Sequence, residues 1–524
     1  MEQMKFSTLI ARITHKVHKD KSLLFIRPNT KGVILSCLAS ILLSTQAYAA
    51  IHPQDESPLA KQIADIAPRH SQVALLARDL TTDKLLYSQQ ADTLFIPAST
   101  QKVLTAVTAM ASLGPDFRYV TELWSDAPIR QGHIAGSVYL RFSGDPTLTQ
   151  DDLKALFAHL QKQGIKSIEG HLYLIGDKQE QLQAPGWVWD DLGICFAAPV
   201  SSYIINQNCV YGQFAPSSAK HASEVKLRAS SFGVKVSSDA IFSPKAGHDF
   251  CQLDLVRLGQ NQYHLRGCYP GSEAIPLAIA ISDPEKFAMD TLIATLKGEM
   301  SLSGKVKMGN AIPAKAKLIA SHSSDPLPEL LKTMLLKSDN LIADSLFKRV
   351  GQSYYKTQGS FTNGAAAMRH ILTDLRIDLT NANIVDGSGL SRYNLLSAKQ
   401  LADVLALLYR DARFHSLVDS LPEAGVSGTL QYRLGYTKPP LKHLVFAKTG
   451  SMQGVANLAG FMRLAQQRDI LFVVLENGIG PETKKQRKPA FSADFLTLLL
   501  NFIESQTQTS QTITTELNTV KLTD

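Results

Sequence analysis

The stretch Ile-Pro-Ala-Ser-Thr-Gln-Lys, residues 96–102, decides how the rest of this chain is interpreted. Pro97 interrupts regular structure, and apolar side chains then recur at helical spacing. These side chains are Val103, Leu104, Val107 and Met110. A helix is therefore expected to begin around Ser99, with Ser99 and Lys102 one turn apart on the same face. Free N–H groups at a helix start favour developing negative charge, and a lysine stripped of water can act as a base. The stretch predicts an activated serine nucleophile.

The Ser-x-x-Lys spacing is weak evidence by itself, because it occurs five times in the chain. The other four pairs are Ser217/Lys220, Ser223/Lys226, Ser345/Lys348 and Ser353/Lys356. An ordinary helix cap is the alternative interpretation of Ser99. Other segments of the sequence must choose among the five pairs.

Two further segments make that choice, and each occurs once in the chain. Ser338-Asp-Asn340 lies between helices expected at 327–336 and 340–351. Lys448-Thr-Gly450 lies in an expected strand, and a hairpin centred on 466–469 follows it, which predicts an antiparallel sheet. Ser-x-x-Lys, Ser-Asp-Asn and Lys-Thr-Gly form the motif set of serine β-lactamases and penicillin-binding proteins.

The chain resembles the class C low-molecular-mass penicillin-binding proteins, which are D-alanyl-D-alanine carboxypeptidases and endopeptidases of the penicillin-binding protein four type. The likeness covers nearly all of the chain beyond its amino-terminal leader. The segments that carry it are 97–103, 184–187, 337–340, 386–392 and 447–451. The 239 residues from Ser99 to Ser338 (338 − 99) also fit, because the family's transpeptidase-like domain is interrupted there by two inserted domains.

The resemblance implies a multi-domain α/β fold. A transpeptidase or β-lactamase-like domain, with an antiparallel sheet flanked by helices, would be interrupted by two largely β domains. The expected parts are a signal peptide at 1–49, the catalytic domain at 50–121 and 328–505, a second domain at 122–194 and 291–327, a third at 195–290, and a tail at 506–524. The Thr-, Gln- and Ser-rich tail is expected to be disordered.

The motif residues have roles that the resemblance and simple electrostatics suggest together. Ser99 is expected to attack the carbonyl of the penultimate D-alanine, with Lys102 as base. Lys448 is expected to help keep Lys102 neutral through like-charge repulsion. Ser338 would relay a proton to the leaving amine, and Asn340 would hold the substrate amide.

The Lys-Thr-Gly strand is expected to supply the remaining contacts to the reacting end of the substrate. The resemblance implies an oxyanion hole formed by the N–H groups of Ser99 and Ser451. Thr449 and Lys448 suit the terminal carboxylate of the substrate, and Gly450 belongs to the same group.

A second group of residues matches the family's subsite for a meso-diaminopimelate side chain. The group consists of Asp191, Phe196, Arg392 and Gln453. The far end of diaminopimelate carries an ammonium and a carboxylate, which suit Asp191 and Arg392 respectively. The alternative is that Arg392 only caps a turn and Asp191 is ordinary surface charge.

The amino terminus predicts export. A basic lead precedes an apolar run from 33 to 43 and then Ala47-Tyr-Ala49, which is typical of a signal peptide cut after Ala49. The apolar run is too short for an uncleaved membrane anchor, which needs about 20 residues. The formal charge of +8 includes +5 from residues 1–49, with seven Lys/Arg and two Asp/Glu, so the mature chain carries +3 (8 − 5). No basic block suggests nucleic acid. A mature periplasmic protein without a transmembrane span is expected.

Four cysteines lie beyond the expected signal peptide, at 195, 209, 251 and 268. In an oxidising compartment this even number suggests two disulfides. The short separations favour Cys195–Cys209 and Cys251–Cys268, although two other pairings remain open. The sequence contains no Cys-x-x-Cys or His-Glu-x-x-His pattern, so neither a metal site nor a cofactor is expected.

The sequence therefore predicts a serine D,D-peptidase whose partners are peptidoglycan stem peptides and cross-links, with β-lactams as covalent inhibitors. A homodimer is left open. One alternative is a secreted β-lactamase, but no Glu-x-x-Asn segment follows Asn340 to activate water as in class A enzymes. Another is a non-catalytic wall-binding or β-lactam-sensing protein, which would tolerate loss of Lys102 or Lys448. An α/β-hydrolase is disfavoured because the chain has no Gly-x-Ser-x-Gly elbow.

Overall fold

The computed structural model describes residues 58–217, 223–243, 251–465, 468–480 and 489–520. The expected signal peptide at 1–49 lies outside the described residues. The chain divides into two units, Met1–Lys61 and Gln62–Asp524. Every element below belongs to the second unit, apart from the start of helix α3 (Pro58–Ile66). Within the described ranges, no helix combines the length and the apolar character that a membrane span requires.

A five-stranded antiparallel sheet forms the base of the catalytic region, in the order β2-β1-β23-β22-β21. Its strands are β1 (Gln72–Asp79), β2 (Leu85–Gln89), β21 (Val445–Met452), β22 (Val455–Arg463) and β23 (Asp469–Asn477). The strands nearest the amino and carboxyl ends of the chain meet where β1 pairs with β23. The expected antiparallel sheet and α/β class are confirmed, and the Lys-Thr-Gly motif lies on the edge strand β21.

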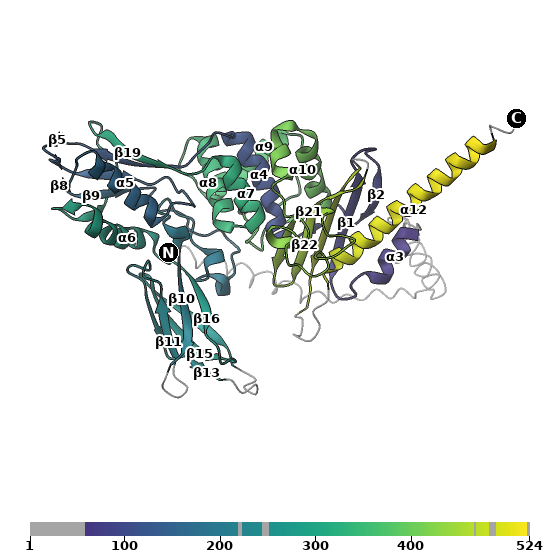
Figure 1. The fold of residues 1–524 in the computed structure, drawn as a ribbon, viewed down its shortest axis with the longest axis horizontal. Coiled ribbons are helices and arrows are strands. Elements are labelled where there is room, and N and C mark those ends of the chain that lie inside the picture. The colour runs from purple at the N-terminus through teal and green to yellow at the C-terminus, as the bar shows by residue number, and fades with distance from the viewer. Residues whose placement is uncertain (1–57, 218–222, 244–250, 466–467, 481–488, 521–524) are drawn as a thin grey trace, which may run out of the picture. The chain divides into compact units, whose positions relative to one another are not determined.

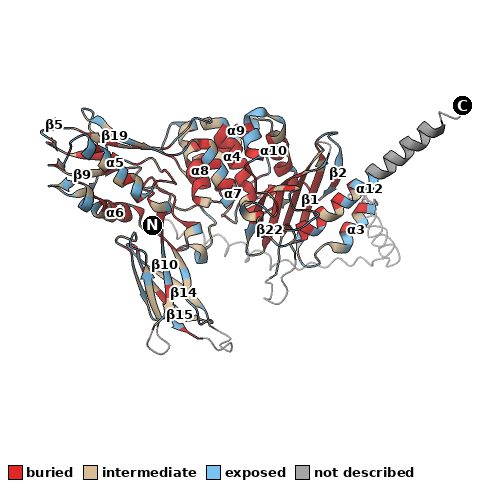
Figure 2. Cartoon of the chain, in the orientation of Figure 1, coloured by how far each residue is buried: buried red, intermediate tan, exposed pale blue. Residues whose placement is uncertain are grey.

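Helices gather against this sheet, and α4 lies in their middle (Figure 1). They are α4 (Lys102–Leu113), α7 (Leu327–Lys337), α8 (Asn340–Tyr355), α9 (Phe361–Asp374) and α10 (Ala398–Arg410). Residues 102–110 of α4 are all buried, as expected of a helix enclosed by other elements (Figure 2). A helix so enclosed holds the residues at its start in a fixed position.

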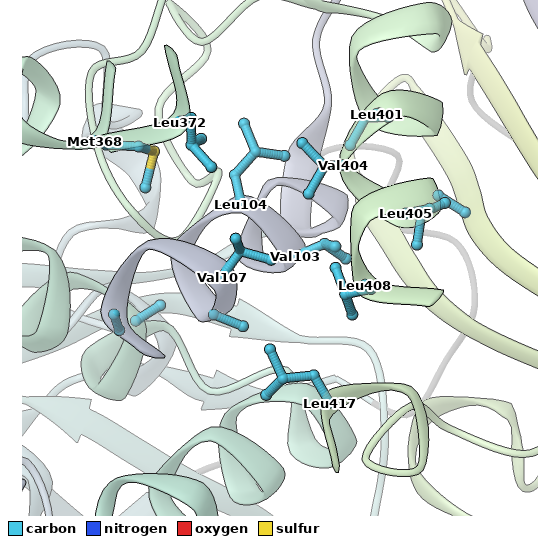
Figure 3. Packing of buried hydrophobic residues seen from close by; sticks show 14 of the residues in the cluster. Val103, Leu104, Val107, Met368, Leu372, Leu401, Val404, Leu405, Leu408 and Leu417 are labelled. Atoms are coloured by element: carbon cyan, nitrogen blue, oxygen red, sulfur yellow. The ribbon is translucent and has the colours of Figure 1, made fainter. Parts of the chain in front are cut away.

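The packing around α4 shows how this fixation arises (Figure 3). Val103, Leu104 and Val107 of α4 meet side chains of the neighbouring helices α9, α10 and α11 (His415–Val418). These neighbours are Met368, Leu372, Leu401, Val404, Leu405, Leu408 and Leu417. Leu104 is completely buried, so truncating it to alanine would cost about 2–5 kcal/mol of stability.

A second group of elements interrupts the catalytic region in sequence. One sheet has the order β18-β9-β7-β4-β19 and a small one the order β17-β8-β6-β5. The larger sheet contains β4 (Val120–Ser125), β7 (Val138–Arg141), β9 (Leu172–Ile175), β18 (Val306–Met308) and β19 (Lys317–Ser323). The smaller contains β5 (Ile129–Arg130), β6 (His133–Ile134), β8 (Ser167–Ile168) and β17 (Ser301–Leu302). Helices α5 (Gln150–Lys162) and α6 (Pro284–Glu299) share a separate hydrophobic core with these sheets.

The third group is built from strands. One sheet has the order β11-β10-β16, with β10 (Cys209–Pro216), β11 (Ser223–Leu227) and β16 (Ile275–Ala280). The other is formed by β12 (Lys235–Ser238), β13 (Ile241–Phe242), β14 (Leu253–Gly259) and β15 (Gln262–Tyr269). Its own core is small, with Phe214, Ala240, Phe242 and Leu265 fully enclosed. The strand-rich character agrees with the expectation for 195–290, but α6 crosses the expected boundary at 290, and the division into domains stays a prediction.

The tail differs from its expectation. Helix α12 runs from Phe491 to Val520, so residues 506–520 are helical and not disordered. Its first turns are anchored by buried Phe495, Leu496 and Leu499. Once a helix has been nucleated, each added residue gains a hydrogen bond at little further cost, so a polar segment can continue it.

Candidate active site

Ser99 lies in a tight turn that leads into α4. The two-stranded pairing of β3 (Leu94–Phe95) with β20 (Leu396–Ser397) brings the chain to Pro97, and a 3₁₀ turn, η1 (Ala98–Gln101), follows. The α-helix itself starts at Lys102, three residues later than expected, because the turn carrying Ser99 is tighter than an α-helical one. The Asn457 side-chain amide donates to the carbonyls of Ile96 and Pro97, both at 2.9 Å, and ties this turn to the sheet.

The amine of Lys102 has three partners. Its Nζ lies 2.9 Å from Ser99 Oγ, 2.6 Å from Asn340 Oδ1 and 2.7 Å from the Ser388 carbonyl oxygen. The amide and carbonyl oxygens can only accept hydrogen bonds. A neutral amine would donate its two N–H groups to them and turn its lone pair toward the Ser99 hydroxyl. The geometry therefore equips Lys102 to take a proton from Ser99.

Burial favours the neutral form of the Lys102 amine. The loss of hydration lowers the pKa of Lys102 to about 8, against opposing attraction from Asp344, Asp386 and Asp339. Lys448 is not among the causes of this pKa shift. The expected repulsion appears instead at Lys448, where burial first and the charge of Lys102 second hold the pKa well below its usual value. Burial, and not repulsion from Lys448, is therefore the main reason why the Lys102 amine can be neutral.

Lys448 connects the other two motifs. Its Nζ donates to Ser338 Oγ at 2.8 Å and to the Thr449 carbonyl at 3.0 Å. Ser338 adopts a left-handed conformation with φ of 58° at the end of α7, an uncommon geometry for a serine that presents its hydroxyl to Lys448. Lys448 is completely buried, and its amine is directed at Ser338.

The close approach of β21 to the Ser99 turn explains why the third motif ends in a glycine, Gly450. A Cβ atom at this position would lie 2.7 Å from the Pro97 carbonyl oxygen and 3.1 Å from the Thr100 nitrogen. Edge strand β21 can therefore approach the Ser99 turn only because residue 450 has no side chain. Gly389, with φ of 80°, is required in the same way, since its Cβ would collide with the Ala98 carbonyl.

Ser388 and Asp344, to which no motif gives a role, hold the Lys102 amine in place, and Asp386 lies close enough for its charge to act on both Lys102 and Asp344. Asp344 Oδ1 accepts the N–H groups of Gly387 and Ser388 at 2.7 and 2.9 Å, and the Ser388 carbonyl in turn accepts from Lys102. Asp386 accepts from the Trp187 indole at 2.9 Å. Burial and the charge of Asp386 raise the pKa of Asp344 well above its usual value. Asp344 follows Asn340 by four residues on α8, so the shared helix face was the available signal.

An open cleft of about 350 Å³ begins at Ser99. Ser99, Ser338, Asn340 and Ser451 line it, together with all four residues of the expected diaminopimelate subsite: Asp191, Phe196, Arg392 and Gln453. The Arg392 guanidinium donates to the Gln453 carbonyl at 3.2 Å. Burial raises the pKa of Asp191, and the charge of Arg392 opposes this, so the two groups sense each other's charge.

Lys448 and Thr449, which were expected to contact the terminal carboxylate of the substrate, are less accessible from the cleft than the sequence suggested. Lys448 is enclosed beneath the cleft, and Thr449 is 5% exposed, with its hydroxyl donating to Thr429 Oγ1 at 2.8 Å. Arg433 lies closer to the cleft surface, where its Nη1 is 3.4 Å from Ser451 Oγ. No motif pointed to Arg433, because its nearness to Ser451 is decided by the fold.

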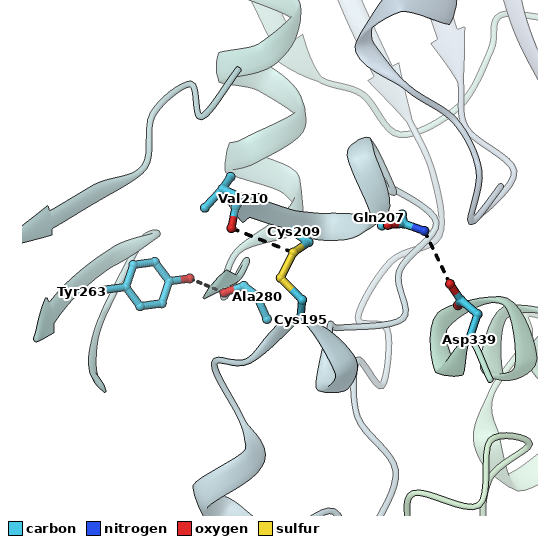
Figure 4. Close-up of a disulfide and its surroundings, with 7 residues drawn as sticks. All are labelled: Cys195, Gln207, Cys209, Val210, Tyr263, Ala280 and Asp339. Carbon is cyan, nitrogen blue, oxygen red and sulfur yellow. Dashed lines mark hydrogen bonds between the residues drawn. A yellow bond between two sulfur atoms is a disulfide. The ribbon is translucent and has the colours of Figure 1, made fainter. Parts of the chain in front are cut away.

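A disulfide lies directly beside the subsite. Cys195 and Cys209 are bonded with Cα atoms 5.4 Å apart, which ties the segment before Phe196 to β10 (Figure 4). The Phe196 carbonyl accepts from Asn340 Nδ2 at 2.8 Å. Cys251 and Cys268 form the other close pair, with Cα atoms 5.1 Å apart. Across the described ranges, no group of three or more His, Cys, Asp or Glu side chains is arranged to hold a metal ion.

Comparison with known proteins agrees with this geometry. Residues 56–495 match the D-Ala-D-Ala carboxypeptidase 3 (S13) family. The chain belongs to this family. It is therefore a serine-type D-Ala-D-Ala carboxypeptidase, a hydrolase, as the motifs predicted.

Two relatives have sequences similar to this S13 carboxypeptidase. The D-alanyl-D-alanine carboxypeptidase DacB of Haemophilus influenzae is 36% identical over 462 residues, covering 87% of this chain and 94% of the relative. The D-alanyl-D-alanine carboxypeptidase of Actinomadura is 28% identical, covering 76% of each chain.

Solved structures support the same assignment. The crystal structure of penicillin-binding protein 4 from Haemophilus influenzae matches with a TM-score of 0.79 at 35% identity, covering 85% of this chain and 99% of that one. A second structure of that protein, in complex with a β-lactam, matches with a TM-score of 0.75 at 34% identity and the same coverage. The expected family and fold class are confirmed.

Proposed function

We propose that this carboxypeptidase acts on peptidoglycan through an acyl-enzyme on Ser99, and that it also cleaves cross-links between D-alanine and meso-diaminopimelate. The hydrogen-bond pattern of Lys102 carries the proposal. In the neutral amine the lone pair would face the Ser99 hydroxyl, because Asn340 and Ser388 would take the two N–H groups.

Acylation begins with transfer of the Ser99 proton to Lys102. The Ser99 oxygen then attacks the carbonyl carbon of the penultimate D-alanine, and the N–H groups of Ser99 and Ser451 stabilise the oxyanion. The proton passes to the leaving amine through Ser338, which accepts a hydrogen bond from Lys448. Lys102 is then neutral again and serves as the base for the water that releases the product.

The terminal carboxylate of the substrate is bound at the Lys-Thr-Gly edge. Ser451 lines the cleft and offers its hydroxyl group there, and Thr449 would join it by turning its hydroxyl from Thr429. Gly450 allows the strand to approach Ser99 closely. Arg433 supplies a positive charge at this edge, since it contacts Ser451 and Lys448 is enclosed. Lys448 acts through Ser338.

Endopeptidase activity is inferred from the subsite. Asp191 would bind the ammonium and Arg392 the carboxylate of the diaminopimelate side chain, with Phe196 against its methylene groups and Gln453 fixing Arg392. The position of this subsite in the same cleft as Ser99 allows a stem peptide to be held while a second, cross-linked stem leaves. Binding of β-lactams to Ser99 is expected, as in the β-lactam complex of the H. influenzae protein.

A periplasmic location is proposed from the amino-terminal sequence and from the cysteines. Export by a signal peptide cut after Ala49 would bring the chain into an oxidising compartment, where Cys195–Cys209 and Cys251–Cys268 would remain as disulfides. Cross-linked peptidoglycan is found in the same compartment.

The deciding experiment incubates the purified mature chain with two substrates. One is a muropeptide monomer ending in D-Ala-D-Ala, and the other is a dimer cross-linked through D-Ala and diaminopimelate. Mass spectrometry should show loss of one alanine from the first and conversion of the second to monomers. Cleavage of the monomer alone would remove the endopeptidase activity from the proposal. Rapid turnover of penicillin with no cleavage of either substrate would favour the β-lactamase alternative instead.

A further inference from the structure

A second groove, of about 670 Å³, lies next to the catalytic cleft and has no part in the mechanism described above. Its walls come from β14, β15 and β16 of the strand-rich region and from the segment 189–194. Gly193 of this segment accepts a backbone hydrogen bond from Ala280 at the end of β16, at 2.9 Å. The segment is thus joined to the strands on its groove side.

The two hollows are continuous at this segment. Asp190 lines both of them. Val188 and Asp191 face the cleft that holds Ser99, whereas Trp189 and Leu192 face the groove. Trp189 and Asp191 belong to the same 3₁₀ turn, η2 (Trp189–Asp191), so a substrate whose diaminopimelate side chain contacts Asp191 lies beside the groove.

Trp189 is exposed to an unusual degree for a tryptophan. It is 76% exposed, whereas the other two tryptophans of the chain, Trp124 and Trp187, each donate their indole N–H to a carboxylate. The indole N–H of Trp189 has no acceptor among the residues that the structure describes. Ile194, on the same segment, is 40% exposed. Clustered apolar exposure beside an active site is typical of a binding surface.

Arg257 of β14 completes the feature. Its guanidinium carbon lies 5.0 Å from the centre of the Trp189 ring, so the guanidinium covers one face of the indole. The same contact holds the positive charge of Arg257 at the groove. Within the described ranges, no carboxylate lies within ion-pair distance of Arg257. A fixed aromatic ring next to an unpaired guanidinium can bind an apolar ring face and a carboxylate together.

We propose that this groove binds the part of the same peptidoglycan substrate that lies between the diaminopimelate residue and the glycan strand. That part contains a γ-linked D-glutamate with a free carboxylate, then L-alanine, then the muramyl sugar. Arg257 binds the glutamate carboxylate, and the open face of Trp189 stacks on the sugar ring. The proposal rests on the proposed function, because it requires a stem peptide in the catalytic cleft.

The test measures kcat/KM for D-alanine release by the mature chain on three substrates of increasing length. They are N-acetyl-diaminopimelyl-D-Ala-D-Ala, the free pentapeptide, and the disaccharide pentapeptide. Trp189→Ala should lower the ratio of disaccharide pentapeptide to free pentapeptide about tenfold. Arg257→Met, which keeps the methylene packing and removes the charge, should lower the ratio of free pentapeptide to the short substrate about fivefold.

Leu258→Ala provides the matched control. Leu258 neighbours Arg257 on β14 and is 60% exposed, but it does not line the groove, so both ratios should stay at the wild-type values. The rate of Ser99 acylation by a small β-lactam reports whether each variant is intact. Unchanged ratios in Trp189→Ala and Arg257→Met, or an equal loss on all substrates, would overturn the groove assignment. Failure of the wild-type chain to release D-alanine from any substrate would refute the proposed function instead.

Discussion

The surroundings of Lys102 and those of Trp189 differ in almost every physical respect. Lys102 is completely buried, and its amine meets three partners within 2.9 Å. Trp189 is 76% exposed and is held by a cation–π contact and by the short segment between Trp187 and Cys195. The difference suits the two proposed tasks, because proton transfer needs fixed distances and little water, whereas a long polymeric substrate needs an open surface.

The two regions are also supported in different ways. The Ser99 turn and α4 are enclosed by helices and by the central sheet, so the catalytic geometry is held by a large hydrophobic core. The segment that carries Asp191 and Phe196 has no buried residue between Trp189 and Asp191, and it is tied down by the Cys195–Cys209 bond. Changes in the first region should abolish chemistry, and changes in the second should alter the choice of substrate.

The largest effect is expected for Ser99→Ala. Loss of the nucleophile should reduce D-alanine release by more than about 10⁴-fold and abolish covalent labelling by a β-lactam, because no other group near Lys102 can form the ester. Ser353→Ala is the matched control, since Ser353 and Lys356 have the same spacing and lie outside the cleft. A label that persists in Ser99→Ala and maps to another serine would contradict the assignment.

The second prediction concerns pH. In the proposed mechanism the neutral form of Lys102 is the base, and burial lowers its pKa to about 8, so the neutral fraction increases as the pH rises through about 8. Stopped-flow acylation by a β-lactam should therefore accelerate with a midpoint near this pH, and below it the rate should fall about tenfold per pH unit. A rate that is constant between about pH 6 and 9 would exclude Lys102 as the titrating base.

The third prediction concerns Asp344, whose hydrogen bonds to Gly387 and Ser388 support the carbonyl that contacts Lys102. Asp344→Ala removes the acceptor for the N–H groups of Gly387 and Ser388, so the carbonyl that holds the Lys102 amine loses its support. Acylation should slow about 10- to 100-fold. Asp344→Asn keeps an acceptor oxygen and should retain most of the activity. Equal loss in both variants would show that the carboxylate acts by another route than these two hydrogen bonds.

The smallest effect is expected at the disulfide beside the subsite. Replacing Cys195 and Cys209 by serine should raise KM for diaminopimelate substrates about three- to tenfold, because the segment before Phe196 loses its tether to β10. The rate of β-lactam acylation should change little. Serine at Cys251 and Cys268 is the control and should leave KM unaltered. An equal increase in KM for both double variants would remove the distinction between the two disulfides.

Much of the catalytic site could be read from short motifs. Ser-x-x-Lys, Ser-Asp-Asn and Lys-Thr-Gly predict the proposed catalytic residues, because each motif's spacing is local and follows from one turn or one strand. The antiparallel sheet and most of its helices also follow from periodic hydrophobic patterns. The prediction of a disordered tail was wrong, because the polar segment continues helix α12, whose first turns are packed against the core.

Other features depend on contacts between distant segments and carry no local pattern. Asp344 and Ser388 reach Lys102 from 242 (344 − 102) and 286 (388 − 102) residues away. The sequence led us to expect that loss of hydration lowers the pKa of Lys102, but only the fold shows that burial outweighs the charges of three distant carboxylates, Asp344, Asp386 and Asp339. No sequence motif contains Arg433, Trp189 or Arg257. Their proposed roles follow only from their neighbours in the fold, which are Ser451 for Arg433 and each other for Trp189 and Arg257.

The sequence by itself determined the reaction. The serines, the lysines and the asparagine occur in the motif set of serine acyl-transfer enzymes, and the local turn brings Ser99 Oγ within 2.9 Å of Lys102 Nζ. Only the tertiary structure decided which groups surround the Lys102 amine, that Arg433 contacts Ser451 while Lys448 is enclosed, and that a second groove adjoins the cleft at Asp190. These properties arise from burial and from distances across the fold, and neither is encoded in any single stretch of the chain.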